Sequence, residues 1–100
     1  MIRDKLIQLK FELECAGWII MNESDFFSAS DDKIEWELYN EYTSSKETLI
    51  FYLFDDLGRR TDKLSNLFYV MRLNDNVRLY IYDDGKEWRY RLKEFVHTIK

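Results

Sequence analysis

The chain has 100 residues and a formal net charge of −4, with 46% hydrophobic and 17% aromatic residues. This hydrophobic content excludes a disordered chain, and the length predicts a single domain, residues 1–100, with one core and no cleft between lobes. With one histidine, one cysteine, no proline and no glycine-rich loop, the sequence lacks most catalytic and cofactor-binding motifs. We therefore expect neither an enzyme nor a cofactor.

The N-terminal segment predicts an amphipathic helix over residues 2–16. Its apolar residues recur at helical spacing in one stripe of Ile2, Leu6, Leu9, Leu13 and Ala16. Gly17 ends this helix, and residues 18–21 form a short apolar strand. Cys15 lies beside the stripe, which predicts an inert packing role. A single cysteine excludes an internal disulfide and favours a cytoplasmic location.

Residues 22–33 are polar and predict a loop around Phe26 and Phe27. Residues 34–42 then alternate between apolar and polar, which is the pattern of a strand with one solvent-exposed face. The residues expected to face the core are Ile34, Trp36, Leu38 and Tyr42, with Asn40 as the polar exception, and those expected on the solvent-exposed face are Glu35, Glu37, Tyr39 and Glu41.

The rest of the chain predicts three more strands and a final helix. Residues 48–54 are apolar on both sides, as in a central strand. A short helical turn is expected at 62–65, and residues 67–73 and 77–82 read as a hairpin joined by Asn-Asp-Asn. Asp84 and Glu87 resemble a capping box. The buried stripe of the helix that follows is expected to be Trp88, Leu92, Phe95, Val96 and Ile99.

This order of elements predicts a two-layer α+β domain. Strands joined by short turns pair antiparallel, and each helix carries a single apolar stripe that can lie on the sheet. We expect four or five antiparallel strands, with the N-terminal and C-terminal helices packed on one face. No stretch approaches the ~20 apolar residues of a membrane span, and the N-terminus lacks the pattern of a signal peptide.

The opposite face of the sheet is the candidate contact surface. Besides the solvent-exposed side of 34–42, the central strand would contribute one of its two sides. These are either Ile50, Tyr52 and Phe54 or Leu49, Phe51 and Leu53. The last hairpin would contribute Arg72, Arg78, Tyr80 and Tyr82. Such a face is either an ordinary solvated surface or an interface, since aromatic residues favour interface cores. A homodimer joined through this face is one form of the second reading.

Charge separates the two halves of the chain. Residues 22–56 contain ten acidic and two basic residues, whereas residues 57–100 contain six acidic and ten basic residues. An unopposed acidic cluster serves either solubility or electrostatic steering onto a basic partner. The predicted partner-binding residues are Glu23, Asp25, Asp31, Asp32, Glu35, Glu37, Tyr39, Glu41 and Glu47.

These features favour a non-enzymatic inhibitor that blocks a basic surface of a nuclease or other nucleic-acid-binding protein. In size, charge and composition the chain is similar to toxin-immunity proteins and to phage inhibitors of bacterial defence. The alternatives are a metal-dependent nuclease that uses the pairs Asp31-Asp32, Asp55-Asp56 and Asp83-Asp84, and a homodimeric structural subunit. We expect no bound metal and no direct contact with nucleic acid. His97, alone on the last helical turn, is not expected to be a ligand.

Overall fold

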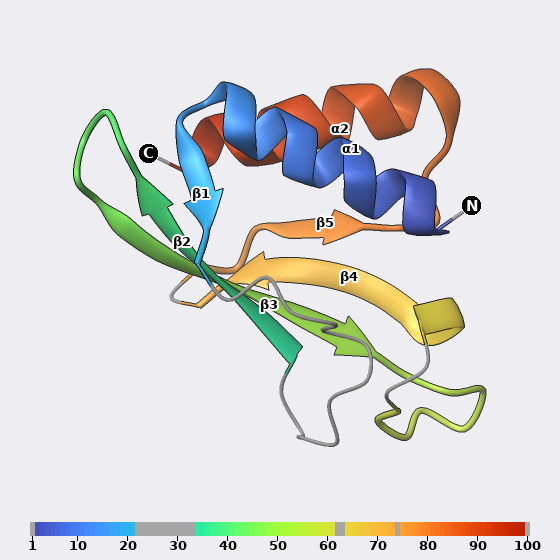
Figure 1. The fold of residues 1–100 in the computed structure, drawn as a ribbon. Coiled ribbons are helices and arrows are strands. Elements are labelled where there is room, and N and C mark those ends of the chain that lie inside the picture. The colour runs from blue at the N-terminus through green and yellow to red at the C-terminus, as the bar shows by residue number, and fades with distance from the viewer. Residues whose placement is uncertain (1, 22–33, 62–63, 74, 100) are drawn as a thin grey trace.

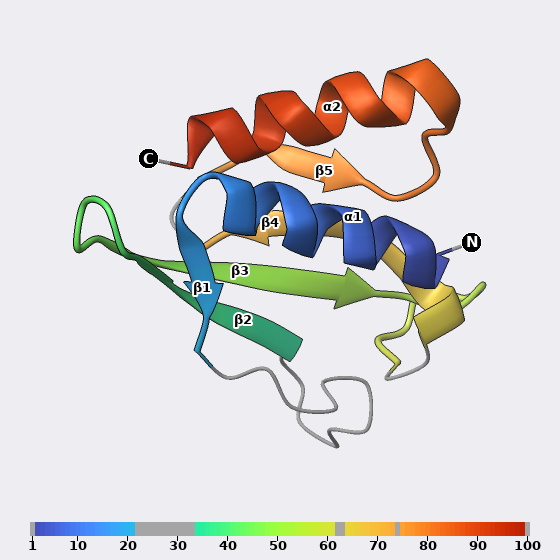
Figure 2. The same cartoon turned by 45° about the horizontal axis from the view of Figure 1, so that its top comes forward.

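In the computed structural model, which describes residues 2–21, 34–61, 64–73 and 75–99, two helices lie on one face of a five-stranded sheet (Figures 1 and 2). The elements are α1 (Ile2–Cys15), β1 (Trp18–Ile20), β2 (Ile34–Asn40), β3 (Lys46–Leu53), the 3-10 helix η1 (Leu64–Asn66), β4 (Leu67–Arg72), β5 (Arg78–Tyr80) and α2 (Gly85–Thr98). The predicted two-layer α+β arrangement is confirmed.

The strands form an antiparallel meander in the order β1-β2-β3-β4-β5. Consecutive strands pair antiparallel: β2 and β3 are joined by a short turn at residues 41–45, whereas the connection between β3 and β4 is longer and includes η1. The strand predicted to be central, β3, lies in the middle of the sheet. Among the described helices, none is long and apolar enough to cross a membrane.

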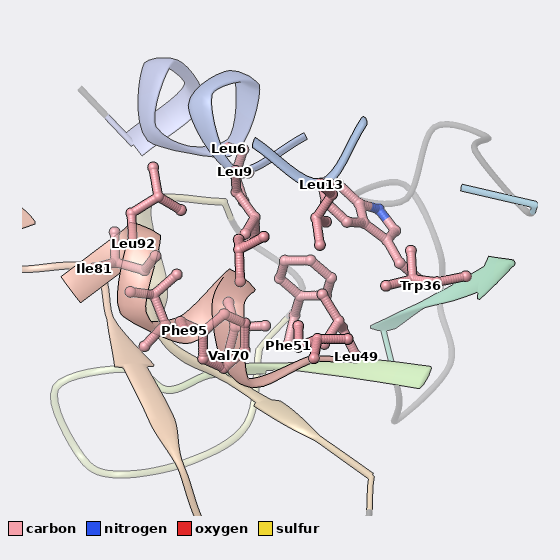
Figure 3. Packing of buried hydrophobic residues seen from close by; sticks show 14 of the residues in the cluster. Leu6, Leu9, Leu13, Trp36, Leu49, Phe51, Val70, Ile81, Leu92 and Phe95 are labelled. Atoms are coloured by element: carbon pink, nitrogen blue, oxygen red, sulfur yellow. The ribbon is translucent and has the colours of Figure 1, made fainter. Parts of the chain in front are cut away.

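The core fills the space between the helices and the sheet, as Figure 3 shows. Leu9 and Leu13 of α1 point toward Trp36, Leu49 and Phe51 of the sheet, and all five are almost fully buried. The rings of Trp36 and Phe51 meet edge to face at 4.8 Å between centroids. The α2 stripe is buried as predicted. Burial of large side chains of this kind contributes roughly 1.5–3 kcal/mol each.

α1 differs from the prediction on its outer side. Leu6, Leu9 and Leu13 are buried, but Ile7 and Phe11 are each 61% exposed. These two residues are four positions apart and so lie together on the surface of the helix. The expectation of a single apolar stripe on this helix is therefore wrong.

The end of β2 depends on the side chain of Asn40. Its amide nitrogen donates to the carbonyl oxygen of Ala16 at 3.1 Å, and its amide oxygen accepts from the backbone N–H groups of Tyr42 and Thr43. The strand ends here, so Tyr42 is 77% exposed and the prediction that it faces the core is wrong. Gly17 has φ +93°, and a Cβ there would lie 2.5 Å from the Tyr42 ring, so glycine is required.

Asp84 is the N-cap residue of α2, as predicted, but the predicted capping box is absent. The Asp84 side chain makes no capping hydrogen bond and instead pairs with the ammonium of Lys5 in α1 at 2.9 Å. That hydrogen bond and the charge of Lys5 hold the pKa of Asp84 below its ordinary value. Lys5 also donates to the carbonyl oxygens of Ile81 and Asp83, so the contact ties the start of α2 to the first helix.

Candidate protein-binding site

The open face, which we define as the sheet face turned away from α1 and α2, carries the acidic side of β2. Glu35, Glu37 and Tyr39 alternate along this strand with side chains that are buried against the helices. Glu37 is exposed, whereas Glu35 and Tyr39 are half-buried. Strand alternation therefore places these three predicted partner-binding residues on one surface.

The other predicted partner-binding residues lie elsewhere. Glu41 follows the end of β2 and is exposed in the turn to β3. Glu47 is directly opposite the buried Leu38, on the face that the helices cover, and its carboxylate accepts a hydrogen bond from Arg72 at 2.6 Å. Glu23, Asp25, Asp31 and Asp32 lie outside the described residues.

The prediction that Arg72 lies on the open face is wrong. Arg72 is opposite Leu49, on the helix-covered face, where its guanidinium pairs with Glu47 and Asp75 and donates to the carbonyl oxygen of Thr98. These acceptors offset part of the desolvation of a partly buried charge, while the Nε of Arg72 is buried without a hydrogen-bond partner. One acidic residue of the 22–56 segment is thus neutralised by an arginine from the C-terminal half of the chain.

Aromatic side chains from β3, β4 and β5 gather beside the acidic strand on the open face. The aromatic cluster, as we name it, consists of Tyr52, Phe54, Phe68, Tyr69, Tyr80 and Tyr82. At its centre the rings of Tyr52 and Tyr69 stack with centroids 4.7 Å apart. At its margin Phe68 is 43% exposed and Tyr82 is 67% exposed. An exposed apolar surface of this kind is typical of an interaction site.

Two members of the aromatic cluster, Phe68 and Tyr69, were not expected from the sequence. The register between β3 and β4 shifts after Tyr52, so that Tyr52 is opposite Tyr69 whereas Leu53 is opposite Leu67. Phe68 is the extra residue of this bulge, and its ring contacts Tyr69 on the open side at 5.5 Å. A bulge places neighbouring residues outside the simple alternation. The sequence signal was the Phe68-Tyr69 pair, two bulky rings in succession.

Two arginines lie over rings of the cluster. The guanidinium of Arg78 is 4.6 Å from the centroid of Tyr69, and that of Arg60 is 5.4 Å from the centroid of Tyr52. Arg78 also donates to the Tyr80 hydroxyl at 3.3 Å, which raises the pKa of Arg78 above its ordinary value. The open face therefore has carboxylates on β2, the Arg78 guanidinium on β5, and the Arg60 guanidinium over the end of β3.

The loop after β3 is shaped by Asp55. Its carboxylate accepts hydrogen bonds from the backbone N–H groups of Leu57 and Arg59 and from the Arg59 side chain, each at 2.9 Å. Phe54 and Arg60 then pair as an isolated antiparallel bridge. Asp55 thus shapes the loop that carries Arg60 over the aromatic cluster, as expected of an aspartate at a turn.

Asp55 should contribute to stability in a pH-dependent way. The backbone N–H of Arg59, followed by that of Leu57, holds the pKa of Asp55 below its ordinary value of 3.8. A lowered folded-state pKa gives a contribution that is complete above the ordinary pKa and is lost as the pH falls through the lowered one. In urea unfolding below about pH 4, Asp55→Asn should show a shallower loss of stability than the wild type. Asp56→Asn is the control; identical acid profiles for wild type and Asp55→Asn would contradict the assignment.

A hollow of about 570 Å³ lies between the C-terminal ends of the helices and the turn after β2. Cys15 and His97 line it, and both are exposed. The prediction that Cys15 is a packing residue is wrong, because the last turn of α1 carries it away from the core. Within the described part of the chain, no group of three or more His, Cys, Asp or Glu side chains is placed to hold a metal ion.

The described open face thus combines an acidic strand with an aromatic cluster on one sheet. Comparisons with protein-family models, with curated proteins and with solved structures found no match for this chain.

Proposed function

We propose that this chain is a non-enzymatic inhibitor that binds a basic, nucleic-acid-handling protein through its open sheet face, in the manner of a toxin-immunity or phage anti-defence protein. The observation that carries the proposal is the position of Glu35 and Glu37 on the same surface as the aromatic cluster. Carboxylates of this kind steer a basic partner and fix its orientation, while tyrosine and phenylalanine supply the contact energy.

The contacts of the rings favour a protein partner over a nucleic acid. Nucleobases bind aromatic platforms by stacking on exposed ring faces. Here Tyr52 and Tyr69 stack on each other, and Arg60 and Arg78 lie over their rings. The two central rings of the cluster are therefore already in contact with other side chains, and the tyrosines add hydroxyl groups, which suit the mixed polar and apolar contacts of a protein interface.

The double variant Glu35→Lys/Glu37→Lys should lose partner binding without unfolding. Both changes lie on the open face and outside the core, so the chain should remain folded, and circular dichroism melting measures any stability lost with the contacts of these two carboxylates. Reversing two interface charges should weaken the dissociation constant by about tenfold or more. The matched control is Glu14→Lys/Glu87→Lys, which makes the same change in net charge on the exposed sides of the helices.

The measurement uses each purified variant immobilised and exposed to lysate of the native host, with elution by a salt gradient. A basic protein retained by the wild type and the control, released at raised salt and not retained by Glu35→Lys/Glu37→Lys, supports the proposal. The dissociation constant of that protein, once purified, is then measured against salt concentration. Equal binding to both double variants, or binding that salt does not affect, would count against the acidic strand as the site.

A further inference from the structure

One row of side chains crosses the open face from an acid to a base. The strand register pairs Glu35 with Ile50, Ile50 with Met71, and Met71 with Arg78. The row therefore begins at a carboxylate on β2, passes Ile50 on β3, which is only 7% exposed, and the half-buried Met71 on β4, and ends at a guanidinium on β5. All four positions point to the same side of the sheet, because residues directly opposite each other across antiparallel strands share a face.

This order is self-complementary under two-fold rotation. An axis that runs along the strands between β3 and β4 turns one open face onto another and exchanges the two ends of the row. Glu35 of each copy then lies opposite Arg78 of the other, and Ile50 lies opposite Met71. A two-fold interface of this type uses the same patch on both subunits. We propose that the chain forms a homodimer through its open face, with Glu35 and Arg78 paired across it.

The neighbouring row obeys the same symmetry. Tyr52, Tyr69 and Tyr80 are opposite one another on β3, β4 and β5, so the rotation sets Tyr52 of one copy against Tyr69 of the other. Face-to-face sheets pack about 10 Å apart, a gap that tyrosine, arginine and glutamate side chains span from the two sides. The dimer also covers the exposed rings of Phe68 and Tyr82, and it gives a four-layer arrangement with helices outside and sheets within.

This inference goes beyond the proposed function and needs no partner protein. Both the second copy and the proposed basic partner would use Glu35, so self-association and partner binding would compete for one surface. A dilute, monomeric chain would then be the form that inhibits. The two ideas fail separately, since self-association is measured with the purified chain alone.

The test is sedimentation velocity of the full chain over a concentration series, with charge-exchange variants. Glu35→Arg and Arg78→Glu, each alone, should weaken the dimer by about tenfold or more, because each homodimer then has two like-charged contacts. An equimolar mixture of these two variants should dimerise as well as the wild type, since every cross-subunit contact in the mixed dimer joins opposite charges. The double variant Glu35→Arg/Arg78→Glu should likewise regain the dimer.

The control exchanges charges on the helix side, with Glu14→Arg and Lys93→Glu, and should leave dimerisation unchanged. Circular dichroism melting of every variant separates loss of the dimer from loss of the fold, and recovery in the mixture shows that both chains are folded. A wild-type chain that stays monomeric at millimolar concentration would overturn the proposal. So would a dimer that no open-face charge variant weakens, or a mixture that fails to recover while both variants remain folded.

Discussion

Replacing Asn40 with alanine should lower the free energy of unfolding by about 2–3 kcal/mol, since it deletes several hydrogen bonds of a buried polar group. Asn40 is 5% exposed. Its side chain joins the carbonyl oxygen of Ala16, after α1, to the backbone N–H groups of Tyr42 and Thr43, after β2. The substitution therefore removes hydrogen bonds at two segments that are far apart in the sequence.

Chemical unfolding of Asn40→Ala beside Asn76→Ala measures this effect. Asn76 is exposed, so its replacement should change the stability by less than about 0.5 kcal/mol. Amide hydrogen exchange should also speed up at Tyr42 and Thr43 in Asn40→Ala, because these N–H groups lose their acceptor. A stability within that same margin for both variants would mean that water replaces the amide without cost.

The element order could be predicted because periodicity reports which side of a helix or strand is buried. Alternation over 34–42 correctly assigned Trp36 and Leu38 to the core and Glu35 to the open face. It identified Asn40 as a polar residue on the apolar side. The function of that side chain could not be predicted, because its partner Ala16 is 24 residues away and local pattern contains no long-range contact. The same limit explains why Tyr42 was expected to face the core. Alternation alone does not show that the strand ends at Asn40, before Tyr42.

The site was predicted only where alternation is unbroken. Glu35 and Glu37 follow it, but the bulge at Phe68 displaces the pattern of β4, so neither Phe68 nor Tyr69 was expected on the open face. Arg72 was assigned to the open face, but it lies on the same side of β4 as the buried Val70. The burial of Arg72 depends on Glu47 of β3 and on the carbonyl oxygen of Thr98 in α2. The spacing of residues in the sequence therefore predicts which face of a strand a side chain occupies. It does not predict which ion pairs form between separate elements.

Replacing Lys5 with methionine should lower the free energy of unfolding by about 2–4 kcal/mol, because two carbonyl oxygens in a partly buried site lose a charged donor. The Lys5 side chain is only 12% exposed. Its ammonium donates to the carbonyl oxygens of Ile81 and Asp83 and lies 5.2 Å from the ring centroid of Trp88. Methionine keeps most of the apolar stem, so the difference reports the ammonium rather than lost packing.

The contribution of the ion pair can be separated from that of the carbonyl contacts. Asp84 has a side chain that is 87% exposed, so solvent screens its attraction to Lys5 and Asp84→Asn should be nearly neutral in stability. Lys5→Met should nevertheless return the pKa of Asp84 toward 3.8, since the hydrogen bond from Lys5 is the main cause of its lowering. Unfolding curves beside the exposed-site control Lys93→Met, and an NMR titration of the Asp84 carboxyl group, measure the two effects. If Asp84→Asn were as destabilising as Lys5→Met, the exposed ion pair rather than the hydrogen bonds to the carbonyl oxygens would join α1 to α2.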